Sequence, residues 1–182
     1  MDDEKRVARQ AIKVIIADDH AIVRDGVRAL LERQEGEFRI VAEVADVPSM
    51  IREVCGQKPD LLVLDLTMPG ESGLEGLPRC FDAYPQLTVA VLTMRDEPEY
   101  AREAFRAGAR SYVLKETEPN ELLRAFRMAV AGESYLHPRV GAVMMSDEDG
   151  PGSAGGLTER EREVVKGIPE LAWHSGLCAR RG

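Results

Sequence analysis

The chain has 182 residues, a net charge of −8 and a charged fraction of 31%, which are ordinary values for a globular protein. This acidic balance argues against a chain built to coat nucleic acid or an anionic membrane. No apolar run reaches the length of a membrane span, and the N-terminal MDDEKRVARQ lacks the apolar core of a secretory signal. Three widely spaced cysteines without a CxxC pair predict reduced thiols, so we expect a cytoplasmic protein.

Short apolar runs alternate with helix-like sequence up to about residue 130. The expected strands are Lys13–Ala17, Phe38–Ala45, Leu61–Leu64, Thr88–Leu92 and Ser111–Leu114. Five helices are expected: one that begins at Ala21, one over about Ser49–Cys55, one that carries the stripe Leu74, Leu77 and Phe81, one over about Glu97–Ala107, and one that begins near Thr117–Pro119. Continuous apolar runs are typical of parallel strands covered by helices on both faces, whereas the alternation in 38–45 predicts a half-exposed edge strand. The pattern predicts an α/β fold with a doubly wound parallel sheet.

A polar residue ends or follows four of the five expected strands. Asp18-Asp19 follow the first strand, Asp65 the third, Thr93 the fourth and Lys115 the fifth. The carboxyl ends of parallel strands meet at one edge of the sheet, where ligands bind. Three carboxylates held together repel one another, and a hard cation such as Mg²⁺ would satisfy them.

Each of these residues also has a plainer interpretation. The acids and His20 could cap a helix, Asp65 could start a turn, Thr93 could be a cap, and Lys115 could pair with a surface carboxylate. The occurrence of all of them at strand ends favours a functional site.

Four motifs in order, VIIADDH, LVLDLTMPGESGLE, VAVLTM and AFRAGARSYVLKE, resemble the receiver domain of NarL/FixJ (LuxR-type) response regulators. The resemblance covers about residues 12–132. It implies the flavodoxin-like, CheY-like fold, whose strand order is 2-1-3-4-5.

The resemblance also implies roles for the residues at the strand ends. Asp65 would be the phosphoacceptor and would bind Mg²⁺ together with Asp18, Asp19 and the backbone carbonyl of Thr67. Lys115 would contact the phosphoryl group.

A switch pair and partners are implied in the same way. Thr93 would bind the phosphoryl group, and Thr93 and Tyr112 would then repack the surface formed by the fourth strand, the following helix and the fifth strand. The expected partners are a sensor histidine kinase and a second copy in a homodimer. We expect no enzymatic activity beyond slow self-dephosphorylation, because Thr67 stands where a haloacid-dehalogenase-type phosphohydrolase has a second Asp.

The sequence after residue 132 departs from that family. Residues 133–156 predict a linker, 157–168 resemble the first helix of a LuxR-type helix-turn-helix domain, and 169–182 form an irregular tail. The resemblance to the helix-turn-helix domain stops after its first helix, as in a truncated or frame-shifted gene, so we expect no DNA binding from this chain. The alternative is a DNA-binding transcriptional regulator, if the native gene carries the full helix-turn-helix domain.

Overall fold

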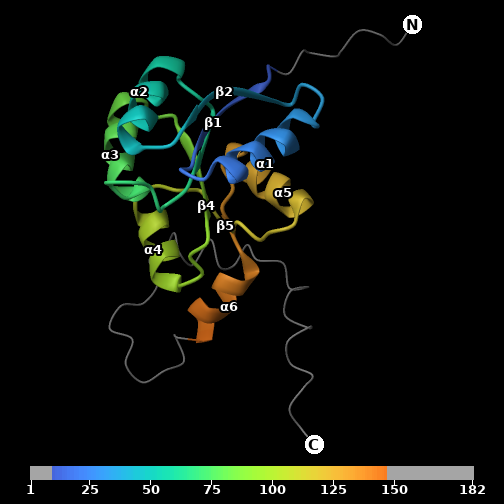
Figure 1. Cartoon of the computed structure of the whole chain (residues 1–182). Coiled ribbons are helices and arrows are strands. Elements are labelled where there is room, and N and C mark those ends of the chain that lie inside the picture. Colours follow the sequence, from blue (N-terminus) through green and yellow to red (C-terminus); the bar gives the residue numbers. More distant parts are fainter. Residues whose placement is uncertain (1–9, 147–182) are drawn as a thin grey trace, which may run out of the picture.

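A six-stranded parallel sheet forms the centre of the molecule (Figure 1). The structure, a computed structural model, describes residues 10–146. The sheet order is β2-β1-β3-β4-β5-β6, and every neighbouring pair is parallel. The strands are β1 (Ile12–Ala17), β2 (Phe38–Val44), β3 (Leu61–Leu64), β4 (Thr88–Thr93), β5 (Ser111–Leu114) and β6 (Tyr135–Leu136). The predicted flavodoxin-like order 2-1-3-4-5 is confirmed, with one further short strand beside β5.

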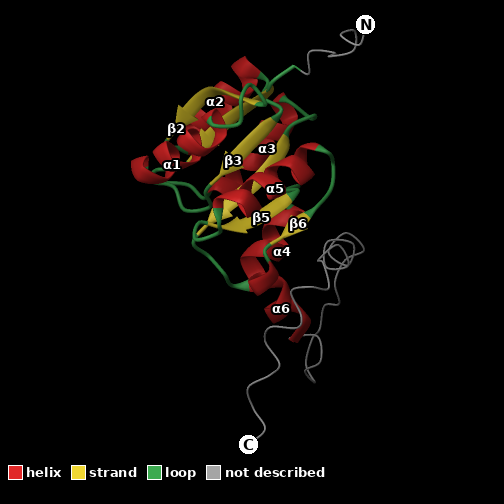
Figure 2. Cartoon of the chain, turned by 90° about the vertical axis from the view of Figure 1, so that its right-hand side faces the viewer, coloured by secondary structure: helices red, strands yellow, loops and turns green. Residues whose placement is uncertain are grey.

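Helices cover both faces of the sheet (Figure 2). They are α1 (Ala21–Glu32), α2 (Val47–Gln57), α3 (Gly73–Ala83), α4 (Pro98–Arg106), α5 (Pro119–Val130) and α6 (Pro138–Ser146). One core holds side chains of α2, α3, α4 and α6, and the other holds side chains of α1 and α5. Within residues 10–146, no helix has the length and apolar character needed to cross a membrane.

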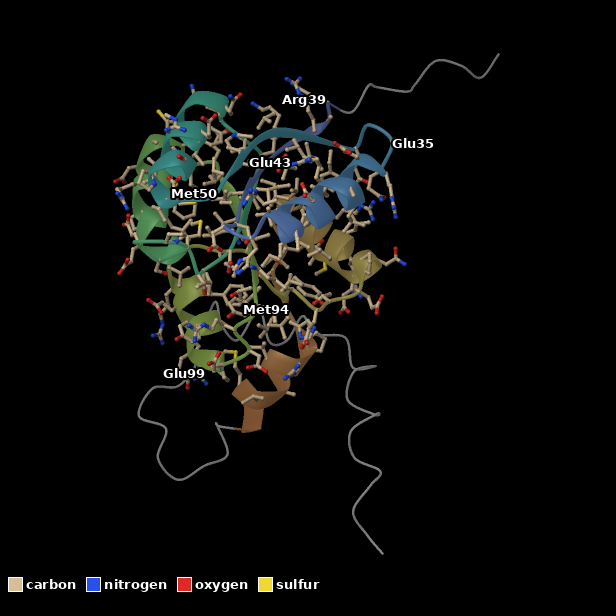
Figure 3. All side chains as sticks on the ribbon, in the orientation of Figure 1. Glu35, Arg39, Glu43, Met50, Met94 and Glu99 are labelled. Atoms are coloured by element: carbon tan, nitrogen blue, oxygen red, sulfur yellow. The ribbon has the colours of Figure 1, made fainter. Side chains whose placement is uncertain are left out.

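The position of a strand in the sheet explains its pattern of residues. In β1, Ile15 and Ala17 belong to the first core while Val14 and Ile16 belong to the second, so the strand is apolar on both faces from Val14 to Ala17. The predicted edge strand is β2, which is half-exposed along most of its length. Arg39 and Glu43 mark its exposed and partly exposed positions in Figure 3.

Helix ends follow the local chemistry of the chain. The α2 helix begins at Val47, two residues before the predicted start, because the side chain of Asp46 accepts a hydrogen bond from the backbone N–H of Ser49 at 2.7 Å. Gly108 comes shortly after α4 with φ +108°, in the left-handed region that favours glycine. A Cβ atom at Gly108 would also lie 2.8 Å from the ring of Phe81, so a side chain would not fit there.

The segment after residue 132 differs from the prediction. We expected a linker over 133–156, but this segment contains β6 and α6, which add a strand to the sheet and a helix to one of its faces. The difference arises because Tyr135 and Leu136 are buried beside β5, and Val140 and Met144 are buried in the first core. The rest of the expected linker, the helix-turn-helix remnant at 157–168 and the tail at 169–182 lie outside the described residues.

Candidate functional site

Two buried carboxylates lie on adjacent strands at the C-terminal edge of the sheet. Asp18 follows β1 and Asp65 follows β3, and the strands' last residues, Ala17 and Leu64, are register partners. The backbone N–H of Asp65 donates to the carbonyl of Ala17 at 2.8 Å, which continues the ladder to the site itself. Each of the two aspartates is only 2% exposed.

The other two strand ends bring a hydroxyl and an ammonium to the same edge. Thr93 is the last residue of β4 and is fully buried. Lys115 follows β5, and its backbone N–H donates to the carbonyl of Thr93 at 2.9 Å. The predicted meeting of the strand ends is therefore seen in the structure.

The ammonium of Lys115 lies between the two buried carboxylates. Its Nζ atom is 2.7 Å from Oδ2 of Asp18 and 2.6 Å from Oδ2 of Asp65. The Lys115 side chain is 7% exposed, so these are buried ion pairs rather than the surface pairing considered from the sequence. Such short distances are typical of charge-assisted hydrogen bonds.

Charge is nevertheless unbalanced at the site. Burial acts to lower the pKa of Lys115, but hydrogen bonds and attraction from Asp18 and Asp65 outweigh it and raise that pKa above its usual value. The lysine therefore remains an ammonium at neutral pH. One ammonium does not balance the three carboxylates of Asp18, Asp19 and Asp65, and a bound cation would relieve the remaining repulsion.

The second oxygen of Asp65 is held by the loop that follows β3. The backbone N–H of Thr67 donates to Oδ1 of Asp65 at 3.2 Å. This contact fixes the orientation of the carboxylate, since Lys115 holds the other oxygen. The role predicted for the carbonyl of Thr67 as a metal ligand stays a prediction.

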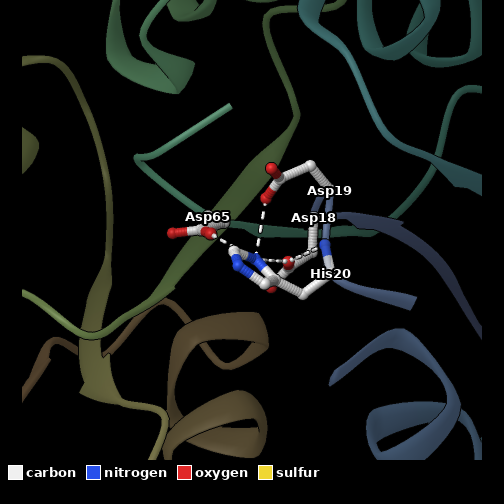
Figure 4. A group of neighbouring side chains, drawn as sticks. All are labelled: Asp18, Asp19, His20 and Asp65. Carbon is white, nitrogen blue, oxygen red and sulfur yellow. Dashed lines mark hydrogen bonds and ion pairs between the residues drawn. The ribbon is translucent and has the colours of Figure 1, made fainter. Parts of the chain in front are cut away.

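His20 also lies in the acidic cluster (Figure 4), whereas the sequence predicts only a polar residue near the site and not a metal ligand. Its Nδ1 atom is 2.8 Å from Oδ1 of Asp19 and 3.2 Å from Oδ1 of Asp18. One ligand atom from each of Asp18, Asp19, His20 and Asp65 lies within 4.8 Å of the others. Carboxylate oxygens are the ligands that Mg²⁺ prefers, so the residues fit the predicted ion. The only available signal in the sequence was the position of His20 directly after the acidic pair.

Helix capping does not account for the acids that follow β1. The N-cap residue of α1 is His20, and its side chain makes no capping hydrogen bond. Asp18 instead accepts the backbone N–H of His20 through Oδ1 at 2.8 Å and binds Lys115 through Oδ2. Its carboxylate is thus directed into the site.

The predicted switch residues meet at the backbone of Arg95. Oγ1 of Thr93 accepts the Arg95 N–H at 3.3 Å, and the hydroxyl of Tyr112 donates to the Arg95 carbonyl at 2.9 Å. Tyr112 is fully buried, and burial raises the pKa of its phenol. The two side chains thus contact opposite ends of one residue in the loop before α4. Met94, which lies between Thr93 and Arg95 in the chain, is 69% exposed (Figure 3).

Comparison with known proteins places this geometry in a family. Residues 14–127 match the response regulator receiver domain. Over 137 residues the chain is 37% identical to the oxygen regulatory protein NreC of Staphylococcus haemolyticus, covering 75% of this chain and 63% of that protein. The chain therefore spans less than two thirds of the length of this relative.

Solved structures give the same result. A two-component response regulator of the LuxR family from Aurantimonas sp. SI85-9A1 is 33% identical, with a TM-score of 0.72 over 76% of this chain and 98% of that one. The isolated REC domain of RcsB from Salmonella enterica serovar Typhimurium, solved in the presence of phosphomimetic BeF3−, is 29% identical, with a TM-score of 0.67 over 73% and 98% of the two chains. RcsB dimers bound to DNA are 29% identical to this chain, with a TM-score of 0.68 over 74% of it and 68% of the RcsB chain.

Proposed function

The chain belongs to the response regulator receiver family, in its NarL/LuxR branch, and from this premise we propose that Asp65 accepts a phosphoryl group from a sensor histidine kinase. The observation that carries the proposal is the contact of Lys115 with Asp65 at 2.6 Å, beside a second buried carboxylate at the C-terminal edge of the sheet. A receiver solved with the phosphomimetic BeF3− has the same fold, which also supports it.

The transfer uses a carboxylate as the nucleophile. An oxygen of Asp65 forms a bond to phosphorus while the bond from phosphorus to the kinase's histidine nitrogen breaks, and that nitrogen keeps the electron pair. Asp18, Asp19, Asp65 and the carbonyl of Thr67 would hold Mg²⁺, which when bound offsets the negative charge of the carboxylate and phosphoryl oxygens. Lys115 adds a fixed positive charge, and positioning with electrostatic stabilisation supplies most of the rate.

The readout depends on the contacts at Arg95. The hydroxyl of Thr93 turns toward the phosphoryl group and weakens its contact with the Arg95 N–H. Because Tyr112 binds the carbonyl of that residue, the loop before α4 and the phenol respond together. The surface of β4, α4 and β5 is then repacked through a shift between two populated states.

Two other functions receive less support. A phosphohydrolase needs an acid-base group two residues after the nucleophile, where this chain has Thr67, so we propose a phosphoacceptor and not an enzyme. RcsB dimers have been solved with DNA. We propose DNA binding only as the alternative in which the native gene carries a full helix-turn-helix domain. We also propose that the protein forms a homodimer and that it is cytoplasmic.

Phosphorylation is tested directly by mass. The protein is incubated with Mg²⁺ and acetyl phosphate, and the intact mass of the wild type is compared with that of Asp65→Asn. We expect one phosphoryl adduct that requires Mg²⁺ and is absent from the variant, since an amide is a far poorer nucleophile. An adduct at full level in Asp65→Asn would show that another residue accepts the phosphoryl group.

A further inference from the structure

The imidazole of His20 lies against the acidic cluster from the solvent side. The side chain is 60% exposed, yet Nδ1 is directed inward and lies 4.0 Å from Oδ2 of Asp65 as well as close to Asp18 and Asp19 (Figure 4). His20 is also anchored, because its backbone N–H donates to Oδ1 of Asp18. A histidine that served only as the first residue before α1 would not need its ring in this position.

We infer that Nδ1 of His20 is a further protein ligand of the divalent ion, and that it gives the site a preference for Mn²⁺ over Mg²⁺. The inference rests on the proposed function, because it concerns the ion held by the same carboxylates. It assigns to His20 a role in metal selectivity.

The distances between the possible ligand atoms support shared coordination. Two ligands about 2.1 Å from one ion lie about 3.0 Å apart at right angles and at most about 4.2 Å apart when opposite. Two of the separations from Nδ1, 3.2 Å to Asp18 and 4.0 Å to Asp65, fall within this range, and the third, 2.8 Å to Asp19, lies just below it. The widest separation in the whole group is 4.8 Å, so a small contraction would bring all four atoms around one ion.

The chemistry of the donors gives the direction of the preference. Mg²⁺ binds oxygen ligands and retains several waters, so it gains little from a nearby imidazole. Mn²⁺ accepts carboxylate oxygens equally well, and first-row transition ions bind imidazole nitrogen more strongly than Mg²⁺ does. Nδ1 now lies 2.8 Å from Oδ1 of Asp19. On coordination the ring proton would reside on Nε2, which leaves the lone pair of Nδ1 free to bind the ion.

Binding of Mn²⁺ and Mg²⁺ to the full chain tests the inference without any measurement of phosphorylation. Free Mn²⁺ is followed by electron paramagnetic resonance in wild type and His20→Gln, and Mg²⁺ affinity is obtained by competition. We expect His20→Gln to weaken Mn²⁺ binding about tenfold or more while changing Mg²⁺ affinity less than about twofold. Pulsed resonance of bound Mn²⁺ should show coupling to a directly bound nitrogen that is lost in this variant.

A control and a contrary result separate this inference from the proposed function. His137→Gln removes a histidine on β6–α6 that is not in the metal-ligand group, and it should keep both the Mn²⁺ affinity and the nitrogen coupling. Equal Mn²⁺ affinity in wild type and His20→Gln, with no nitrogen coupling, would overturn the role of His20 and leave phosphorylation at Asp65 intact. Absence of binding of either ion to the wild type would overturn the metal site itself.

Discussion

Lys115 is the residue whose charge stabilises the site when no divalent ion is bound. Its ammonium contacts Asp18 and Asp65, whose side chains are 4% and 2% exposed. In Lys115→Met the apolar stem is kept but both carboxylates lose their partner. Leaving buried charged groups unpaired costs about 1–3 kcal/mol or more, so we expect a lower melting temperature in the absence of divalent ions. Added Mg²⁺ should restore more stability to the variant than to the wild type, because no ammonium competes for the carboxylates.

The matched control is an exposed ion pair. Arg127 binds Glu37 at 2.6 Å, but the Arg127 side chain is 46% exposed, and such pairs contribute less than about 1 kcal/mol. Arg127→Met should therefore change the melting temperature little, with or without Mg²⁺. If Lys115→Met were as stable as Arg127→Met in buffer without divalent ions, the carboxylates would not depend on Lys115.

At the scale of elements, α6 is attached by both apolar and ionic contacts. Val140 and Met144 are at most 1% exposed and pack in the first core. Arg139 pairs with Asp96 in the loop before α4 at 2.6 Å and with Glu116 after β5. All three charged side chains are more than 40% exposed, so burial of the apolar side chains supplies most of the attachment.

This ranking predicts different effects on hydrogen exchange. Val140→Ala removes two buried methyl groups and leaves a cavity, so amide exchange in α6 should increase strongly. Arg139→Gln should increase that exchange only slightly, and raising the salt concentration in the wild type should have a similarly small effect. Exchange in β1 serves as the internal control and should be unchanged. If Arg139→Gln released α6 as fully as Val140→Ala, the ion pairs would be the principal attachment.

The sequence predicts the elements better than their contacts. The strands leading to Asp18, Asp65 and Lys115 are apolar because both faces of the sheet are covered, and this pattern is visible without a structure. A two-residue strand such as β6 is too short to show a period, and its burial depends on its pairing with β5. The position of the His20 ring depends on a rotamer at the start of α1, which no spacing encodes.

At the scale of the whole molecule, His137 joins the sheet to the last described helix. Its backbone N–H donates to the carbonyl of Tyr112 at 2.9 Å, which continues the β5–β6 ladder. The ring is half-buried, and among residues 10–146 its Nδ1 atom has no hydrogen-bond partner. Burial lowers the pKa of His137, although Glu121 and Glu116 act in the opposite direction.

A lowered pKa makes the free energy of unfolding depend on pH. The unfolded chain binds a proton at His137 near pH 6.5, whereas the folded chain binds it only at lower pH. The stability contributed by the neutral ring is therefore complete above about pH 6.5 and is lost as the pH falls from there through the folded pKa. We expect the melting temperature of the wild type to fall more steeply than that of His137→Gln between about pH 7 and pH 5. Every other ionisable group is the same in both proteins, so the difference between the two curves isolates His137. Parallel curves would mean that the ring is equally easy to protonate in the folded and unfolded chains, and that the β6–α6 junction opens to water.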